Sequence, residues 1–187
     1  MKKFLVYGSS EFGRVIRDLL DACGLQFAGY IDDFNKGADI TGCFSDAVRR
    51  FPSDAYGIVI AIGYKDLNAR WSAYKKALDS GYGVPAIIHP KAYVRDESLI
   101  GKGAIVMAGA TVDSNASIGE LCVLWPGAIV NHDSIVGSNT FLSPNATVCG
   151  AVEIEGGSFI GAGAVIVDHV TVHYGTFVGA GAVYTGK

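Results

Sequence analysis

A histidine and an aspartate stand next to each other in the second half of the chain, at His132 and Asp133. Imidazole titrates near neutral pH, so an outward-facing histidine can accept the proton that an attacking ammonium group must lose. The neighbouring carboxylate could orient the ring or raise its basicity, although adjacent residues need not point the same way. The alternative is an ordinary solvent-exposed histidine. We take His132 as the candidate general base and Asp133 as its partner.

A pair of acids, Asp32 and Asp33, follows the apolar segment 27–31. Carboxylates at such a place can accept hydrogen bonds from ribose hydroxyls or from the N–H of a base. The alternative is a capped turn, in which Asp is common. Another apolar segment, 58–62, ends in Gly63, which could simply terminate a strand. Two adjacent acids at the predicted ligand edge of a sheet favour nucleotide binding.

Glu11, Phe12 and Gly13 open a predicted helix, and the free N–H groups of a first helical turn attract phosphate. Gly8 and Gly13 are separated by four residues, without the middle glycine of the dinucleotide fingerprint. Glu11 is also an unusual neighbour for a pyrophosphate. We therefore exclude NAD and keep Glu11, Phe12 and Gly13 as candidate substrate contacts.

Residues 1–83 have the pattern of an α/β domain. Short apolar runs predict strands at 3–7, 27–31 and 58–62, and a helix begins near residue 11 and ends at Gly24. Asp66 can cap a second helix, whose apolar face is predicted to contain Leu67, Trp71, Tyr74 and Leu78. Alternating strands and helices imply a parallel sheet that binds ligands beyond the carboxyl ends of its strands.

Residues 84–187 follow a six-residue repeat. Every sixth residue from Val94 to Val178 is aliphatic, and the residue four places later is always small or β-branched. This period fits neither a helix nor a flat strand, but it fits a three-sided coil with one inward aliphatic residue per side. The repeat amounts to about five coils of eighteen residues. His132 is third in its hexad, an outward position, and Gly150 lies one coil later, about 4.8 Å along the coil axis.

Bulk composition excludes several classes of protein. No run approaches the ~18 apolar residues of a membrane span, and the first residues lack the apolar stretch of a secretory signal, so we expect a cytoplasmic protein. A net charge of −3 without basic clusters argues against nucleic acid as a ligand. The 4 cysteines form no CxxC pair, which favours free thiols over disulfides.

The hexads resemble the left-handed β-helix of hexapeptide-repeat acyltransferases. Combined with a preceding α/β domain, the chain resembles bacterial nucleotide-sugar N-acetyltransferases of the PglD-like or NeuD-like family over nearly its whole length. Four motifs in this order and spacing carry the resemblance: Gly8-Ser9-Ser10-Glu11-Phe12-Gly13, Ile31-Asp32-Asp33-Phe34, Ala61-Ile62-Gly63 and Ile129-Val130-Asn131-His132-Asp133.

The resemblance implies a homotrimer that transfers an acetyl group from acetyl-CoA to the amine of a UDP-, dTDP- or GDP-linked 4-amino-sugar, without a metal. It places the nucleotide on the first domain, against Gly63, and CoA between neighbouring β-helices. It also implies that the Gly150 N–H stabilises the oxyanion and that Ala162 and Ala180 contact CoA through backbone groups. Glycine and alanine at these corners could instead serve packing alone.

Several residues depart from the family pattern. Phe12 stands where the bacillosamine enzyme has a histidine near the sugar, which leaves the sugar open. Trp125 and Phe141 replace polar residues near the acetyl-transfer site, and we keep Phe141 as a candidate cofactor contact. The sequence ends in Thr185-Gly186-Lys187 without the Gly-x-Pro-Ala tail that often folds beside CoA, so a shorter tail suffices or the CoA site is less enclosed.

Three alternatives stay open at this point. Trimeric β-helices of the γ-class carbonic anhydrases bind zinc through three histidines, and this chain has His132, His169 and His173. These three occupy different hexad positions, however, and a one-residue slip turns side chains to opposite faces. O-acetylation of a sialic acid or another sugar could use the same base. A scaffold protein without catalysis is the third alternative, against which the retained pair of His132 and Asp133 speaks.

Overall fold

The computed structural model describes residues 3–186 and divides into two compact units, Met1–Pro85 and Ala86–Lys187. Each unit is described by itself. Together they give the predicted fold class, a small α/β domain with a short parallel sheet followed by a parallel β-helix of about five coils, consistent with the left-handed form. Within residues 3–186, no helix combines the length and the apolar character needed to cross a membrane.

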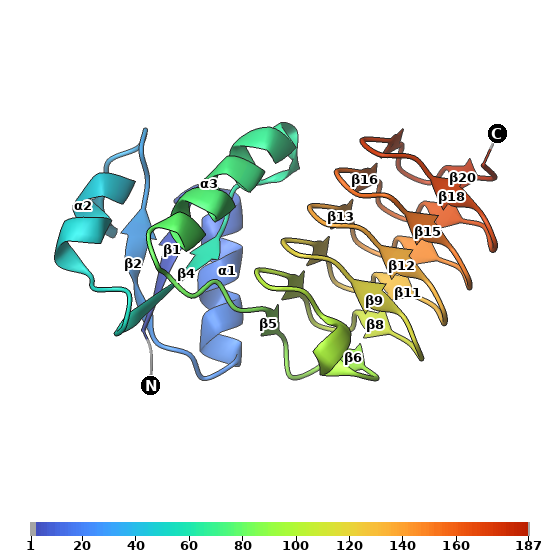
Figure 1. The fold of residues 1–187 in the computed structure, drawn as a ribbon, viewed down its shortest axis with the longest axis horizontal. Coiled ribbons are helices and arrows are strands. Elements are labelled where there is room, and N and C mark those ends of the chain that lie inside the picture. The colour runs from blue at the N-terminus through green and yellow to red at the C-terminus, as the bar shows by residue number, and fades with distance from the viewer. Residues whose placement is uncertain (1–2, 187) are drawn as a thin grey trace. The chain divides into compact units, whose positions relative to one another are not determined.

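The first unit contains a four-stranded parallel sheet in the order β3-β2-β1-β4, with helices packed around it (Figure 1). Its elements are β1 (Lys3–Tyr7), α1 (Glu11–Ala22), β2 (Phe27–Ile31), β3 (Ile40–Gly42), α2 (Phe44–Arg50), β4 (Tyr56–Ile60), the 3₁₀ helix η1 (Tyr64–Asp66) and α3 (Leu67–Asp79). The first two predicted strands are confirmed residue for residue. The third begins two residues earlier than expected and ends at Ile60, while β3 and α2 had no signal in the sequence.

The two predicted helices form, but the buried face of the second differs from the prediction. In α1, Ile16, Leu19 and Leu20 are buried, and Gly24 ends the helix with a φ of 66°. In α3, the Asp66 carboxylate caps the helix by accepting the Ala69 N–H at 2.7 Å.

The buried residues of α3 are Arg70, Ala73, Tyr74 and Ala77. Of the predicted apolar face only Tyr74 is buried, while Leu67, Trp71 and Leu78 remain partly exposed. The prediction for those three residues is wrong, because the small side chains of Ala73 and Ala77 let the helix approach β4 along a different stripe.

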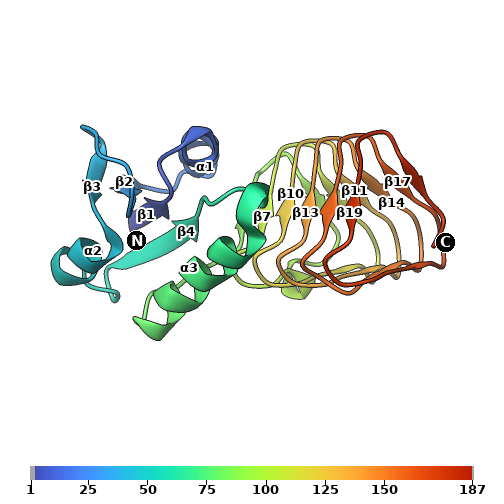
Figure 2. The same ribbon diagram turned by 90° about the horizontal axis from the view of Figure 1, so that it is seen from above.

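The second unit is a parallel β-helix whose coils stack with an eighteen-residue register, as the pairing of Ile129 with Thr147 shows (Figure 2). Its three sheets have the orders β19-β16-β13-β10-β7-β5, β20-β17-β14-β11-β8-β6 and β18-β15-β12-β9. The elements are β5 (Ile87–Ile88), β6 (Tyr93–Val94), η2 (Glu97–Leu99), β7 (Ile105–Val106), β8 (Thr111–Val112), β9 (Ser117–Ile118), β10 (Val123–Leu124), β11 (Ile129–Val130), β12 (Ile135–Val136), β13 (Phe141–Leu142), β14 (Thr147–Val148), β15 (Glu153–Ile154), β16 (Phe159–Ile160), β17 (Val165–Ile166), β18 (Thr171–Val172), β19 (Phe177–Val178) and β20 (Val183–Tyr184).

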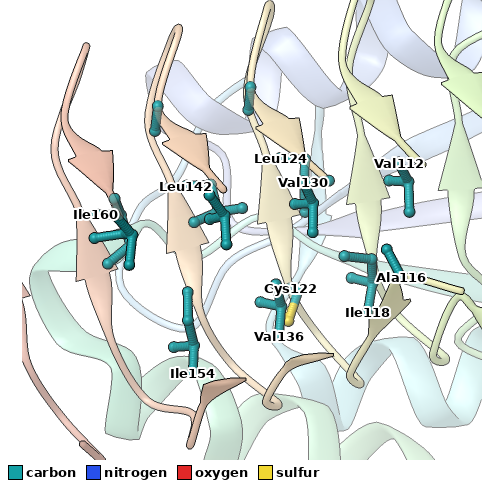
Figure 3. Packing of buried hydrophobic residues seen from close by; sticks show 14 of the residues in the cluster. Val112, Ala116, Ile118, Cys122, Leu124, Val130, Val136, Leu142, Ile154 and Ile160 are labelled. Carbon is teal, nitrogen blue, oxygen red and sulfur yellow. The ribbon is translucent and has the colours of Figure 1, made fainter. Parts of the chain in front are cut away.

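The interior of this coil is the stack of aliphatic residues that the repeat predicts. Leu124, Val130 and Val136 supply one side chain from each side of a single coil, and all three are buried (Figure 3). Small residues four places after an aliphatic one, such as Ala128 and Ala146, are also fully buried. The core therefore fixes the position of each corner along the coil axis, and with it the position of the outward-facing residues at that corner.

Candidate active site

The pair of His132 and Asp133 lies at the corner that follows β11. Asp133 has a φ of 58°, a left-handed conformation that Asp tolerates better than most residues. Its Oδ2 lies 2.9 Å from His132 Nδ1, and its Oδ1 accepts a hydrogen bond from Asn115 Nδ2 at 3.0 Å. Asn115 stands one coil before Asp133, so the stacking of coils fixes the carboxylate against the imidazole.

This arrangement sets the chemical role of each imidazole nitrogen. The hydrogen bonds from His132 and from Asn115 lower the pKa of Asp133, so the carboxylate is ionised near neutral pH. An ionised carboxylate accepts the proton of Nδ1, which leaves the lone pair of the neutral ring on Nε2. His132 and Asp133 are both exposed, with 61% and 54% of their side-chain surface accessible, so Nε2 can receive a proton from a bound molecule.

Gly150 lies directly against the imidazole, one coil after His132. A Cβ atom at position 150 would stand 2.6 Å from His132 Nε2 and 2.7 Å from Cε1, so only glycine leaves space for the ring here. The Ala151 N–H donates to the His132 carbonyl at 3.0 Å. The Gly150 N–H has no hydrogen-bond acceptor among residues 3–186. A histidine nitrogen and a free backbone donor thus lie at one corner of the β-helix.

The three histidines of the carbonic anhydrase alternative do not form a cluster. His173 Nδ1 lies 3.3 Å from Glu155 Oε1, and His169 Nε2 lies 3.9 Å from Asp168 Oδ2. Within the described part of the chain, no three His, Cys, Asp or Glu side chains are grouped as metal ligands. The structure gives the zinc alternative no support.

A pocket of about 440 Å³ lies in the first unit, at the carboxyl ends of β1, β2 and β4. The predicted residues Asp32, Asp33 and Gly63 line it, together with residues from the loop after β1 and from α3. This is the edge at which parallel sheets bind ligands. Of the residues proposed from the sequence as substrate contacts, these three are brought together.

Asp32 is buried, and its carboxylate accepts hydrogen bonds from other groups of the protein. Oδ2 accepts hydrogen bonds from the Ser9 N–H at 3.0 Å, from Ser9 Oγ at 2.6 Å and from Asn35 Nδ2 at 3.1 Å. Oδ1 accepts the N–H groups of Phe34 and Asn35 at 2.9 and 2.8 Å. Burial acts to raise the pKa of Asp32, but these hydrogen bonds outweigh it and hold the pKa well below the ordinary value. Asp32 therefore ties together the two loops that form the pocket edge.

Asp33 is part of a cluster with Tyr7 and Lys76. Its Oδ2 accepts the Tyr7 hydroxyl and lies 3.4 Å from Lys76 Nζ, and its Oδ1 accepts the Phe44 N–H at 2.7 Å. Burial acts to raise the pKa of Asp33, but these contacts lower it overall, whereas burial and the nearby carboxylate raise the pKa of Tyr7. Tyr7 and Lys76 were not predicted as site residues, because no local signal in the sequence links a residue of β1 to one of α3.

Glu11, Phe12 and Gly13 do not line this pocket. Phe12 is buried with 8% exposure, and a Cβ at Gly13 would lie 2.3 Å from the Gly8 carbonyl oxygen. Phe12 thus packs in the core, and glycine at 13 allows the first turn of α1 to approach the end of β1. Glu11 is exposed and lines a separate surface groove along α1.

The three residues proposed for CoA lie away from His132 within one chain. Phe141 is buried, with ring centroids 6.1 Å from Trp125 and 5.9 Å from Phe159. Ala162 and Ala180 are exposed at the corners that follow β16 and β19, on a different side of the coil from the corner after β11. A single chain therefore does not bring the base and these residues to one place.

Two family models match the chain: the PglD N-terminal domain over residues 3–77 and the bacterial transferase hexapeptide repeat over residues 115–150. The hexapeptide repeats and the similar solved structures show an acyltransferase of the hexapeptide-repeat class. Within that class, the chain resembles the PglD-like nucleotide-sugar N-acetyltransferases, whose N-terminal domain model matches residues 3–77. No match was found among curated proteins.

Solved structures of similar fold cover nearly the whole chain. The acetyltransferase domain of PglB from Neisseria gonorrhoeae FA1090 is 28% identical, with a TM-score of 0.87, over 99% of this chain and 92% of that one. PerB from Caulobacter crescentus, solved in complex with CoA and GDP-perosamine, is 29% identical, with a TM-score of 0.89, over 99% and 89% of the two chains. WeeI from Acinetobacter baumannii AYE, at 24% identity and a TM-score of 0.76 over 98% and 96%, shows the same fold.

Proposed function

We propose that this enzyme transfers the acetyl group of acetyl-CoA to the amine of a nucleotide-linked 4-amino-sugar. The observation that carries the proposal is that His132 Nε2 lies where a Cβ of residue 150 would stand, one coil away, on a β-helix that follows a PglD-type domain. The similar structures that hold CoA, acetyl coenzyme A or GDP-perosamine support the choice of both substrates.

In the proposed reaction, the sugar amine attacks the thioester carbonyl directly. His132 Nε2 takes the proton from the attacking nitrogen, while Asp133 holds the other side of the ring and stabilises the imidazolium that forms. The Gly150 N–H, which has no acceptor among residues 3–186, donates to the developing oxyanion. When the tetrahedral intermediate collapses, the C–N bond remains, the C–S bond breaks, and the imidazolium returns the proton to the CoA thiolate. No covalent acyl-enzyme is needed.

The pocket that contains Asp32, Asp33 and Gly63 is the proposed nucleotide site. UDP-, dTDP- and GDP-linked sugars share a pentose and a diphosphate, which a sheet edge of this kind accommodates. Measuring turnover with a panel of such nucleotide-linked acceptors, each with a 4-amino group, tests which base and which sugar the enzyme takes.

We also propose a homotrimer with CoA bound between neighbouring β-helices. The support is the separation of His132 from Ala162 and Ala180, which lie at a different corner of the β-helix, because a second copy can bring these corners together. Sedimentation of the full chain should give three copies per particle, and a catalytically active monomer would refute this assembly.

His132→Ala should lower kcat by at least about 10²-fold, the usual contribution of a positioned general base. Release of the CoA thiol from acetyl-CoA, measured with a thiol reagent and a 4-amino-sugar nucleotide, gives the rate. His173→Asn is the matched control, because His173 is also exposed and also lies beside a carboxylate, and it should leave kcat unchanged. Near-normal turnover of His132→Ala across pH would remove His132 from the mechanism. If a 4-hydroxy acceptor were turned over as fast as the 4-amino acceptor, the result would favour O-acetylation over N-acetylation.

A further inference from the structure

Phe34 is an unusually exposed aromatic residue. Its side chain lies in the loop between β2 and β3, where 95% of the residue surface is accessible, and it lines the pocket of the first unit. Because the ring is exposed to water, it contributes no hydrophobic stabilisation to the fold. Its place at the mouth of a pocket gives it an apolar face with which to meet a ligand.

The loop that presents this ring is held firmly. The Phe34 and Asn35 N–H groups both donate to Asp32 Oδ1, and Asn35 Nδ2 donates to Asp32 Oδ2. The adjacent Asp33 is also held, because its Oδ1 accepts a hydrogen bond from the Phe44 N–H. The backbone of Phe34 is therefore fixed on both sides, so its ring meets a ligand at a low cost in conformational entropy.

The two carboxylates beside Phe34 have little capacity left for a ligand. Asp32 already accepts five hydrogen bonds, whereas a carboxylate offers about four lone-pair sites. Asp33 is occupied by Phe44, Tyr7 and Lys76. Reading the N–H edge of a base through Asp32 would break bonds that hold the pocket together, and Asp33 keeps about one lone-pair site, on Oδ1. The ring face of Phe34, by contrast, is fully available to a base.

We propose that Phe34 stacks on the base of the bound nucleotide, and that this pocket senses the base through stacking area rather than through its aspartates. This inference rests on the proposed function, because it assumes a nucleotide in this pocket. Every base has a π-face, so purine and pyrimidine nucleotides both bind, and the larger purine binds more tightly. Asp32 is then a positioning residue that holds the loop of Phe34.

Calorimetric titration of the full chain with GDP and with UDP tests this directly. Phe34→Ala should raise the Kd of GDP by at least about fivefold, the lower end of measured base-stacking effects. The ratio of UDP to GDP dissociation constants, above one in the native protein, should fall toward one in Phe34→Ala. Phe34→Tyr keeps a stacking ring and should retain both values. Val48→Ala truncates another exposed apolar side chain of the same unit, outside the pocket, and should change neither.

The failure of this inference differs from a failure of the proposed function. A native protein that binds neither nucleotide would overturn both. Native binding of both nucleotides with an unchanged Kd in Phe34→Ala would overturn stacking alone. A Phe34→Ala variant that changes only the sedimentation of the protein would show that the ring contacts another protein copy instead. Exposure of the ring means that none of these variants disturbs the core, and equal thermal unfolding checks this.

Discussion

Replacement of Gly150 by alanine tests the proposed geometry of catalysis most sharply. The new Cβ would stand 2.6 Å from His132 Nε2, and the imidazole must retreat by about 0.8 Å to reach an ordinary contact of 3.4 Å. Gly150 does not have a positive φ, so alanine fits the backbone without strain. The atoms that must move belong to an exposed side chain. The ring therefore moves while the coil stays.

The expected result is a loss of activity without a loss of stability. A misplacement of a catalytic group by about 1 Å can cost about 10²-fold in rate, so kcat of Gly150→Ala should fall by about that factor. The free energy of unfolding should stay level or rise by less than about 1 kcal/mol, because alanine restricts the unfolded chain. Acetyl-CoA turnover gives kcat, and urea unfolding followed by circular dichroism gives the free energy.

Gly119→Ala is the matched control for this variant. A Cβ at Gly119 would lie 2.6 Å from the backbone nitrogen of Ser138, an atom held in the next coil. That substitution should lower the free energy of unfolding by about 1 to 3 kcal/mol, as overpacking does, and leave the turnover of the folded enzyme close to native. Native kcat in Gly150→Ala, or equal loss of stability in both variants, would refute the reasoning about His132 and Gly150.

Two further predictions concern the carboxylates. Asp133→Asn keeps a residue that tolerates the left-handed corner, but it no longer fixes the Nδ1 proton of His132. We expect kcat to fall at least about tenfold, with KM for acetyl-CoA unchanged. A native kcat would show that Asp133 does not orient His132. Asp32→Asn should lower the free energy of unfolding by about 2 to 4 kcal/mol at pH 7, because an amide cannot accept all the hydrogen bonds of the buried carboxylate. Since its pKa is lowered in the folded state, Asp32 stabilises the fold fully above the ordinary carboxyl value of 3.8, and this contribution is lost as the pH falls below it toward the folded value. The stability difference between native protein and Asp32→Asn should therefore shrink in acid, and a difference that stays constant from pH 7 to pH 3 would contradict this account.

The β-helix was predictable from the sequence because its determinants are local and repeated. Each hexad places one aliphatic residue inside, and the neighbours that bury it come from the same position eighteen residues away. The strands β1 and β2 were equally clear, because each is a short apolar run bounded by turn residues. β3 has only three half-buried residues and no period to detect, which is why sequence analysis missed it.

The sequence by itself also placed His132, Asp133 and Gly150 at one corner, because counting along the repeat converts sequence separation into height on the coil. Only the tertiary structure decided that Asp133 turns its carboxylate onto Nδ1, since this depends on a left-handed backbone and on Asn115 from the preceding coil.

In the first unit, the sequence indicated the edge of the sheet at which a ligand binds, but not the side-chain contacts that form the pocket there. Tyr7 and Lys76 lie 69 residues apart and meet only because the sheet and α3 bring them together. Asp32 had the residue type of a ligand contact, yet its hydrogen bonds go to Ser9, Phe34 and Asn35, so it organises the loop that exposes Phe34. Residue type and local order are properties of the sequence, whereas the partners that occupy a side chain are fixed by contacts between distant segments, and these exist only in the folded chain.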